Sequence, residues 1–345
     1  MRIVLLQDDY PPHHVGGAGI AVHSLAKELQ RKGHDVLVVT TVRSRKDAGE
    51  VLVDGVRVYA IPSSYSIYLR SWISLYNPRV TARVETLLRS FNPDIVHAHN
   101  IHMHLSYHCL KLGKAIGARV VLTLHDAMAF HYGKLIEPLE DTQSICSVDD
   151  FTVSAWKQFL RYKRYYNPFR NRIIRYYLRY VDRIISVGTT LQSAALQNRL
   201  KHVHVLHNGI SVDDWKISTE KTILFKEKYS LTHRNVVLFG GRLSAGKGGE
   251  QTIRMLAQAV EKVPEIVLVI IGSRNPYSDT LVTLARKLGI ERNLLFTGWL
   301  SGDELKAAYH ASDVVCVPSI YLEPFGLISL EAMACKKPVV ATCVG

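Results

Sequence analysis

Short apolar runs alternate with amphipathic stretches along the N-terminal part of the chain. RIVLLQ (2–7) and DVLVVTT (35–41) have the composition of buried strands, and GGAG at 16–19 opens a helical pattern between them. The segment 51–62 alternates with a period of two and has a turn at Asp54-Gly55. The same pattern predicts further strands at 94–99, 119–126, 183–188 and 202–209, and helices near 78–90, 103–116 and 190–199. Such alternation predicts a parallel sheet with helices on both faces.

The alternation restarts with NVVLFGG (235–241), which leads into a second glycine-rich turn. It predicts further strands at 266–272, 293–298, 314–319 and 338–342, and helices near 248–262, 278–288, 302–311 and 324–335. The predicted fold class is therefore α/β, with two doubly wound, Rossmann-like domains at 1–206 and 207–345. Because the chain stops directly after a strand, we expect the C-terminal domain to be truncated.

Composition narrows the classes of protein that this chain can belong to. With 345 residues, 47% of them hydrophobic and 21% charged, the chain has an ordinary globular composition, which excludes disordered and collagen-like proteins. No apolar run approaches the ~20 residues of a membrane-spanning helix, and no secretory signal is evident. Five scattered cysteines favour reduced thiols in a cytosolic protein. The net charge of +13 permits several kinds of anionic partner.

Two glycine-rich turns join a strand to a helix, at 16–19 and 240–249. Glycine lets backbone amides approach a ligand, and the helix N-terminus behind such a turn favours a phosphate, although either turn could also bind nothing. The first turn departs from a dinucleotide-binding motif, because Val22 replaces its third glycine and the second strand ends without an acidic residue.

The second turn departs from a P-loop, which needs Ser or Thr after its lysine to hold Mg²⁺, because Gly248 stands there. It carries Arg242 as well as Lys247, a pair of cations suited to neutralising a diphosphate without a metal. A solvated cationic pair is the alternative.

Two carboxylates accompany the predicted helix near 324–335. Pro324 suits a first helical turn, which places Glu323 at the helix N-terminus near Gly326 and Leu327, and Glu331 about two turns into the helix. A carboxylate at a helix N-terminus is stabilised by ~0.3–1 kcal/mol, so a purely structural cap is one interpretation. The other is that both carboxylates bind hydroxyls of a sugar and a ribose.

Histidines end two neighbouring predicted strands. His125 and Asp126 end one strand, and His97 and His99 end the strand before it, where open α/β sheets place ligand crevices. Satisfied polar residues and a binding site are both consistent with this pattern. No metal site is predicted, because the nearby histidines have no carboxylate or cysteine at ligand spacing.

These motifs together resemble those of the GT-B glycosyltransferases, specifically the large retaining family four (glycosyl transferases group 1). The similar features run from residue 1 to 345, and they are GG at 16–17, LTLHD at 122–126, HNGI at 207–210, GRLSAGKG at 241–248 and the double-glutamate segment 323–331. The combination of GRL-x3-KG with the double-glutamate segment is the most specific part of the resemblance.

The resemblance implies a nucleotide-sugar donor, retention at the anomeric carbon, no obligatory metal, no cofactor, and two domains that close over the donor from either side of a cleft. It implies that the amides of Gly16 and Gly17 contact the donor diphosphate, which Arg242 and Lys247 clamp. It further implies that Glu323 binds hydroxyls of the donor sugar, aided by the backbone amides of Phe325, Gly326 and Leu327. Glu331 would bind the ribose, and His125 would hydrogen bond the reacting sugar. Arg242, Lys247, Glu323 and His125 would then be the catalytic residues.

A basic, aromatic stretch at 156–180 has no counterpart among these motifs. Its aromatic residues interleave with lysines and arginines, as in Trp156-Lys157. A stretch of this composition could dock on an anionic membrane surface. A helix packed by its aromatic stripe, with a solvated basic face, is the alternative.

The sequence thus predicts a glycosyltransferase that moves a hexose from a nucleotide sugar to a polysaccharide, glycan or lipid-linked acceptor. The predicted location is the cytoplasm, with peripheral association at the inner membrane face if 156–180 docks there. One alternative is another nucleotide-sugar enzyme of the same fold, such as an epimerase. A second is a basic nucleic-acid binder, although no nucleic-acid-binding module is evident and no such partner is predicted.

Overall fold

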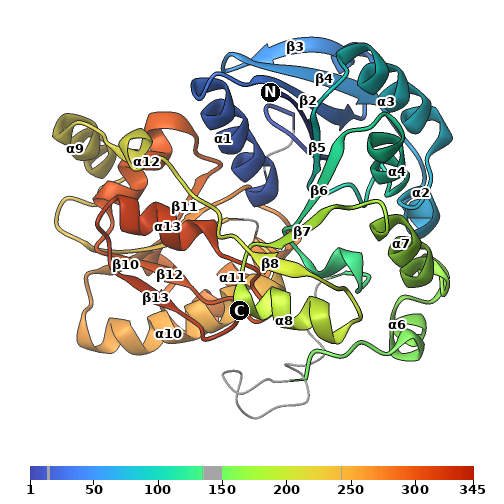
Figure 1. Ribbon diagram of the computed structural model, residues 1–345. Helices are drawn as coiled ribbons and strands as arrows, with labels where there is room; N and C mark the ends of the chain where they lie inside the picture. Colours follow the sequence, from blue (N-terminus) through green and yellow to red (C-terminus); the bar gives the residue numbers. More distant parts are fainter. Residues whose placement is uncertain (14–15, 134, 136–149, 242) are drawn as a thin grey trace. The chain divides into compact units, whose positions relative to one another are not determined.

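The computed structural model describes residues 1–13, 16–133, 135, 150–241 and 243–345, which form two compact units. The first unit takes its described residues from between Met1 and Gly209, and the second takes them from Ile210 to Val344 (Figure 1).

The first unit is built on an eight-stranded sheet with the strand order β3-β4-β2-β1-β5-β6-β7-β8. All neighbouring strands are parallel except β3 and β4, which form an antiparallel pair around the turn at Asp54 and Gly55. The strands are β1 (Arg2–Leu6), β2 (Asp35–Val42), β3 (Gly49–Val53), β4 (Val56–Pro62), β5 (Ile95–Ala98), β6 (Arg119–Leu124), β7 (Arg183–Ser186) and β8 (Val203–Val205). The strand order reverses between β1 and β5.

Helices cover this sheet on both faces: α1 lies on one side, and α3 and α4 lie on the other (Figure 1). Val22 and Ala26 of α1 are fully buried against β1 and β2. The helices are α1 (Gly17–Arg31), α2 (Arg70–Ile73), α3 (Pro78–Phe91), α4 (His108–Ala115), α6 (Ala155–Tyr162), α7 (Arg170–Leu178) and α8 (Thr189–Gln197). The 3-10 turns include η1 (Arg45–Asp47), η2 (Ile67–Leu69), η3 (Ala127–Ala129) and η5 (Lys163–Tyr165).

The second unit contains a five-stranded parallel sheet with the order β11-β10-β9-β12-β13. Its strands are β9 (Asn235–Gly240), β10 (Ile266–Ile271), β11 (Leu294–Gly298), β12 (Val314–Val317) and β13 (Val339–Ala341). Its helices are α9 (Thr219–Lys228), α10 (Gly249–Lys262), α11 (Pro276–Lys287), α12 (Gly302–Ala311) and α13 (Leu327–Ala334), with 3-10 turns η6 (Asp213–Trp215), η7 (Ala245–Lys247) and η8 (Glu291–Asn293). Here the strand order reverses between β9 and β12.

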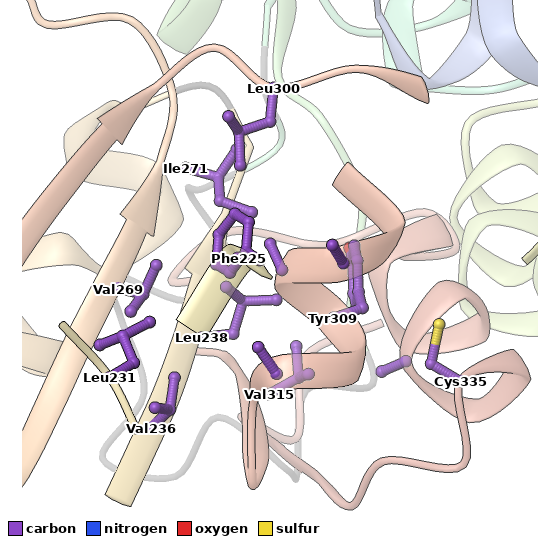
Figure 2. Close-up of a cluster of buried hydrophobic side chains, with 14 of the residues drawn as sticks. Phe225, Leu231, Val236, Leu238, Val269, Ile271, Leu300, Tyr309, Val315 and Cys335 are labelled. Atoms are coloured by element: carbon purple, nitrogen blue, oxygen red, sulfur yellow. The ribbon is translucent and has the colours of Figure 1, made fainter. Parts of the chain in front are cut away.

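Successive residues of β9 pack on opposite faces of this sheet, as expected for an all-buried parallel strand. Val236 and Leu238 join a core with side chains from α9 and α12, including Phe225 (Figure 2). Val237 and Phe239 join a second core with α10 and α11. Full burial of one such side chain stabilises the fold by about 1.5–3 kcal/mol.

Two parallel-sheet, Rossmann-like units confirm the predicted fold class, but two helix starts were predicted wrongly. The last helix begins at Leu327, not near 324, because Gly326 has a φ of +80° and so interrupts the helical backbone; Pro324 precedes the helix. The helix expected from 103 begins at His108. Among the described residues, no helix combines the length and the apolar character needed to cross a membrane.

Candidate functional site

Each sheet has a point at which its strand order reverses, and open α/β sheets bind ligands beside the carboxyl ends of the strands at such a point. In the second unit this point lies between β9 and β12. The loop after β9 carries Lys247, and the loop after β12 carries Glu323. In the first unit the reversal lies between β1 and β5, and His125 follows the strand next to β5.

The loops after β9 and β12 are in direct contact. The N–H of Ile320 donates to the carbonyl oxygen of Gly246 at 3.0 Å. Gly248 has a φ of +74°, and a Cβ atom on it would lie 1.8 Å from the carbonyl oxygen of Pro318. Only glycine fits there, because any side chain would push the two loops apart. Gly248 therefore replaces the P-loop hydroxyl residue for a steric reason.

Lys247 and Glu323 form an ion pair across these loops. The Lys247 Nζ lies 2.6 Å from Oε2 of Glu323, and the two side chains are only 20% and 15% exposed. The hydroxyl of Ser319 donates to the same oxygen at 2.8 Å. The ammonium group also lies 5.2 Å from the ring centroid of Tyr321, within range of a cation–π interaction. The structure thus brings together two of the residues predicted to bind the donor.

The environment of Glu323 keeps it ionised. Burial by itself would raise its pKa, but the charge of Lys247 and the hydrogen bonds from Lys247 and Ser319 outweigh burial and hold the pKa below its ordinary value. The pair therefore presents a full positive and a full negative charge at the end of the sheet.

Glu331 lies about one turn into α13, not two as predicted, because the helix begins later. The hydroxyl of Tyr309 on α12 donates to Oε2 of Glu331 at 2.5 Å. Burial raises the pKa of Glu331, and the Tyr309 hydrogen bond offsets part of that rise. Tyr309 is itself 2% exposed and packs edge-on against Trp215, so it holds Glu331 rigidly. Tyr309 was not predicted as a site residue.

The remaining predicted residues of this unit cluster around the start of α13. Phe325 and Gly326 precede the helix, Leu327 begins it, and all three are half-buried. Arg242, the second predicted cation, lies outside the described residues.

In the first unit, the predicted glycines lie at the start of α1. Gly16 is the N-cap residue in extended conformation, and Gly17 is the first helical residue. A Cβ atom on Gly16 would meet nothing within 4 Å, whereas one on Gly19 would lie 2.6 Å from the carbonyl oxygen of Asp9. The close backbone approach in this turn is therefore at Gly19.

His125 belongs to a cluster of imidazoles at the ends of β5 and β6. Its Nε2 lies 2.9 Å from Nδ1 of His99, whose ring lies tilted against that of His97 with centroids 4.1 Å apart. His97 hydrogen bonds to Thr123 at 2.8 Å, and Nε2 of His102 lies 3.4 Å from Asp126. The predicted meeting of strand-end groups is thus present.

Burial keeps these imidazoles uncharged. It lowers the pKa of His125 to about 4, that of His102 to about 4 and that of His97 to about 3. It also lowers the pKa of His99 well below its ordinary value. At neutral pH each ring therefore offers one N–H donor and one nitrogen acceptor.

Asp8, which follows β1, fixes the loop beside this cluster and was not predicted. Its Oδ2 accepts from the N–H of Met103 at 2.6 Å, and its Oδ1 accepts from those of His104 and Leu105 at 2.9 and 2.7 Å. These bonds hold residues 103–105 outside the helix. Burial raises the pKa of Asp8 to about 7, although the three N–H groups lower it. The only signal in the sequence was its position directly after a strand.

The part of the chain that the structure describes contains no group of three or more His, Cys, Asp or Glu side chains arranged to hold a metal ion.

Comparisons with known proteins agree with this architecture. The chain is 29% identical to an uncharacterized glycosyltransferase of Methanocaldococcus jannaschii, over all of this chain and 81% of the relative. It is 27% identical to a glycogen synthase of Mycobacterium tuberculosis, over all of this chain and 78% of that enzyme. The crystal structure of Anabaena HepE in complex with UDP and glucose matches with a TM-score of 0.69 and 21% identity, over 99% of this chain and 80% of HepE.

The two Rossmann-like units, with glycine turns after the first strand of each, define the GT-B class of folds. Two family models cover most of the sequence: glycosyltransferase family 4 matches residues 15–214, and glycosyl transferases group 1 matches residues 220–345. The chain therefore belongs to the group 1, family 4 glycosyltransferases.

Proposed function

We propose that this protein transfers a hexosyl group from a nucleotide-sugar donor to a hydroxyl of a polysaccharide, glycan or lipid-linked acceptor. The observation that carries the proposal is the half-buried Lys247–Glu323 pair at the reversal point of the second sheet. A nucleotide sugar carries a diphosphate next to sugar hydroxyls, and the pair offers a cation for the first and a carboxylate acceptor for the second. HepE, which has the same fold, was solved with UDP and glucose.

In this proposal, Lys247 stabilises the negative charge that grows on the diphosphate as the bond to the anomeric carbon breaks. A preorganised cation at that position is worth about 10²–10³ in rate. Arg242 is proposed as a second cation on the same group. Because these side-chain cations would neutralise the negative charge of the diphosphate, we propose that the reaction needs no metal ion.

Glu323 is proposed to accept hydrogen bonds from hydroxyls of the donor sugar, with the amides of Phe325, Gly326 and Leu327 nearby. Glu331 is proposed to bind the ribose hydroxyls, because Tyr309 already fixes its orientation from the neighbouring helix. The two carboxylates would then bind different parts of one donor.

From the first unit, His125 is proposed to hydrogen bond the reacting sugar, and the amides of Gly16 and Gly17 to contact the diphosphate. A neutral imidazole suits the role of His125, because it can donate to a sugar hydroxyl without attracting the departing anion. The family resemblance implies net retention of configuration. Because no carboxylate is proposed as a nucleophile, we propose that the acceptor hydroxyl attacks the anomeric carbon from the face that the diphosphate leaves, without a stable covalent intermediate.

We further propose that the enzyme acts in the cytoplasm, with peripheral contact at the inner membrane face. Support comes from the exposed basic and aromatic residues of α6 and α7.

A thermal-shift screen of nucleoside diphosphates and nucleotide sugars tests this function. We expect one nucleoside diphosphate to raise the unfolding midpoint, and a nucleotide sugar of the same base to be consumed when an acceptor is added. NMR of the product's anomeric configuration then tests retention, and activity in excess EDTA tests the independence from metal. Release of a new sugar isomer without any acceptor would instead establish an epimerase, and no shift with any nucleotide would contradict the proposal.

A further inference from the structure

Two segments of the first unit contain no acidic residue at all. Residues 55–84 and 151–181 lack both Asp and Glu, although both contain several arginines and aromatic residues. The first segment includes η2 and α2, and the second includes α6, η5 and α7. The first of these segments was not singled out by the sequence pattern.

Although far apart in the sequence, the two segments meet in the fold. The rings of Tyr68 in η2 and Tyr165 in η5 stack with centroids 4.7 Å apart. The guanidinium group of Arg164 donates to the Tyr68 hydroxyl at 2.9 Å and lies 4.4 Å from the centroid of the same ring. Helices α2, α6 and α7 lie along the same side of the first unit (Figure 1). The two segments therefore form one continuous surface, here called the basic-aromatic face.

Large apolar side chains are exposed on this face from both segments. In α6, Trp156 is 66% exposed and Leu160 is 53% exposed, while in α2 Trp72 is 52% exposed. The exposed apolar residues that define the face are Ile67, Leu69, Trp72, Trp156, Leu160 and Phe169. Scattered apolar residues are common on surfaces, but a group of this size rimmed by polar residues marks an interaction site.

The cations of the face accompany these apolar groups. Arg172 lines an open hollow of about 380 Å³ together with Phe169, Ile173 and Tyr176. The three apolar or aromatic side chains of this hollow suit the acyl chain or glycerol backbone of a lipid, and the guanidinium group suits its phosphate headgroup. Because neither segment contributes a carboxylate, the cations contributed by the face are not offset by acidic residues of its own.

We propose that the basic-aromatic face binds the surface of an anionic lipid bilayer. Tryptophan and tyrosine favour the boundary between water and hydrocarbon, and each cation near an anionic leaflet adds to the affinity. A nucleic acid would use the cations and the aromatic rings, but it gains little from aliphatic side chains such as Ile67, Leu69 and Leu160. This inference deepens the membrane contact of the proposed function, because it defines the surface by adding residues of η2 and α2, and it rests on the proposed function in its meaning for the acceptor, which a membrane-bound enzyme would meet at the lipid surface.

The test is co-sedimentation of the full chain, without nucleotide, with vesicles of phosphatidylcholine alone or of equal parts phosphatidylcholine and phosphatidylglycerol. We expect binding to the second kind of vesicle only. Arg172→Glu should lower the partition coefficient about 30-fold, since it changes the charge of the face by two units, and Leu160→Ser about threefold.

Matched variants of the second unit serve as controls. Leu224→Ser removes a leucine that is 54% exposed, close to the 53% of Leu160, and Arg292→Glu reverses an exposed arginine of η8. Both should bind vesicles like the wild type, and all four variants should retain the wild-type unfolding midpoint. Equal loss in the controls, binding without phosphatidylglycerol, or no binding would overturn the proposal. So would tight binding of an RNA oligonucleotide without vesicle binding. The nucleotide screen on the same protein tests the proposed function separately.

Discussion

At the carboxyl ends of its strands the second unit carries a half-buried ion pair, whereas the first unit carries a group of largely buried, uncharged imidazoles. Lys247 and Glu323 keep their charges because each compensates the other. His97, His99 and His125 instead avoid the cost of a buried charge by giving up the proton, and neutral hydrogen bonds join His97 to Thr123 and His99 to His125. Two halves with the same strand–helix architecture thus meet the same electrostatic problem in opposite ways.

The difference suggests a division of labour between the units. Charge is useful where a reaction develops charge, so the second unit is suited to hold a diphosphate. Neutral donors and acceptors are useful where hydroxyls must be oriented, so the imidazoles of the first unit are suited to the hydroxyls of the reacting sugar, alongside Glu323 of the second unit.

Removing the positive charge of Lys247 from the second unit should have the largest effect on this contrast between the units. Lys247→Ala deletes the cation, while Ser319 still donates a hydrogen bond to Glu323. We expect turnover of the nucleotide sugar to fall about 10²–10³-fold, because the leaving diphosphate loses its stabilisation. Initial rates of donor consumption measure this.

Lys262→Ala, at the exposed end of α10, is the control and should retain wild-type rates. Circular dichroism of both variants checks that they fold. Near-wild-type turnover of a folded Lys247→Ala protein would show that the ion pair is structural.

The two glycine turns provide a second comparison. Gly248→Ala places a Cβ atom 1.8 Å from the Pro318 carbonyl oxygen at a positive φ, whereas Gly16→Ala meets nothing within 4 Å. We expect the first change to lower the free energy of unfolding by about 2–4 kcal/mol and the second by less than about 0.5 kcal/mol. Urea denaturation curves of the two variants measure the difference; equal midpoints would mean that the loops after β9 and β12 separate easily.

Lowering the pH should destabilise the first unit in particular, because the histidines with lowered pKa values belong to it. Below the ordinary histidine pKa of about 6.5, the unfolded chain takes up protons that His97, His102 and His125 cannot bind in the folded protein. The free energy of unfolding therefore decreases as the pH is lowered. Asp8 acts in the opposite direction, because its raised pKa of about 7 means that the folded form binds a proton first as the pH falls. With His99, whose pKa is also lowered by burial, four histidines against one aspartate leave a net loss of stability on the order of 3–5 kcal/mol between about pH 7.5 and pH 5.

Unfolding midpoints of the wild type and of His102→Gln at the two pH values measure this effect. The variant has one fewer buried histidine, so its midpoint should depend less on pH. An identical pH dependence of the two proteins would contradict the assignment.

Apolar periodicity predicted most of the sheet strands, because a strand buried on both faces has an uninterrupted apolar run in its sequence, as in β1 and β9. The start of α13 was misplaced because Pro324 is compatible with a first helical turn, while the positive φ of Gly326 depends on how the loop after β12 packs. The short elements η2 and α2 have no periodicity of their own to detect.

Within the candidate site, the sequence predicted Lys247, Glu323 and His125, of which the structure pairs the first two, but it did not predict their supporting residues. Tyr309 and Asp8 act through contacts that join distant parts of the chain, Tyr309 with Glu331 and Asp8 with the loop at 103–105. Such partnerships depend on how helices and loops pack, which a single sequence does not encode in any local pattern.

The hydrogen-bonded Lys247–Glu323 pair has a consequence for selectivity. Because the Lys247 ammonium is already matched by the Glu323 carboxylate, the pair attracts an unrelated anion only weakly. Inorganic phosphate that binds Lys247 would leave Glu323 without its counterion and without a new hydrogen-bond donor. A free sugar that binds Glu323 would leave Lys247 without a new anionic partner. We expect only a molecule that joins an anionic group to hydroxyls, at the right separation, to give both side chains new partners in a single event. We therefore expect the proposed donor, which joins a diphosphate to sugar hydroxyls, to bind more tightly than inorganic phosphate or a free sugar.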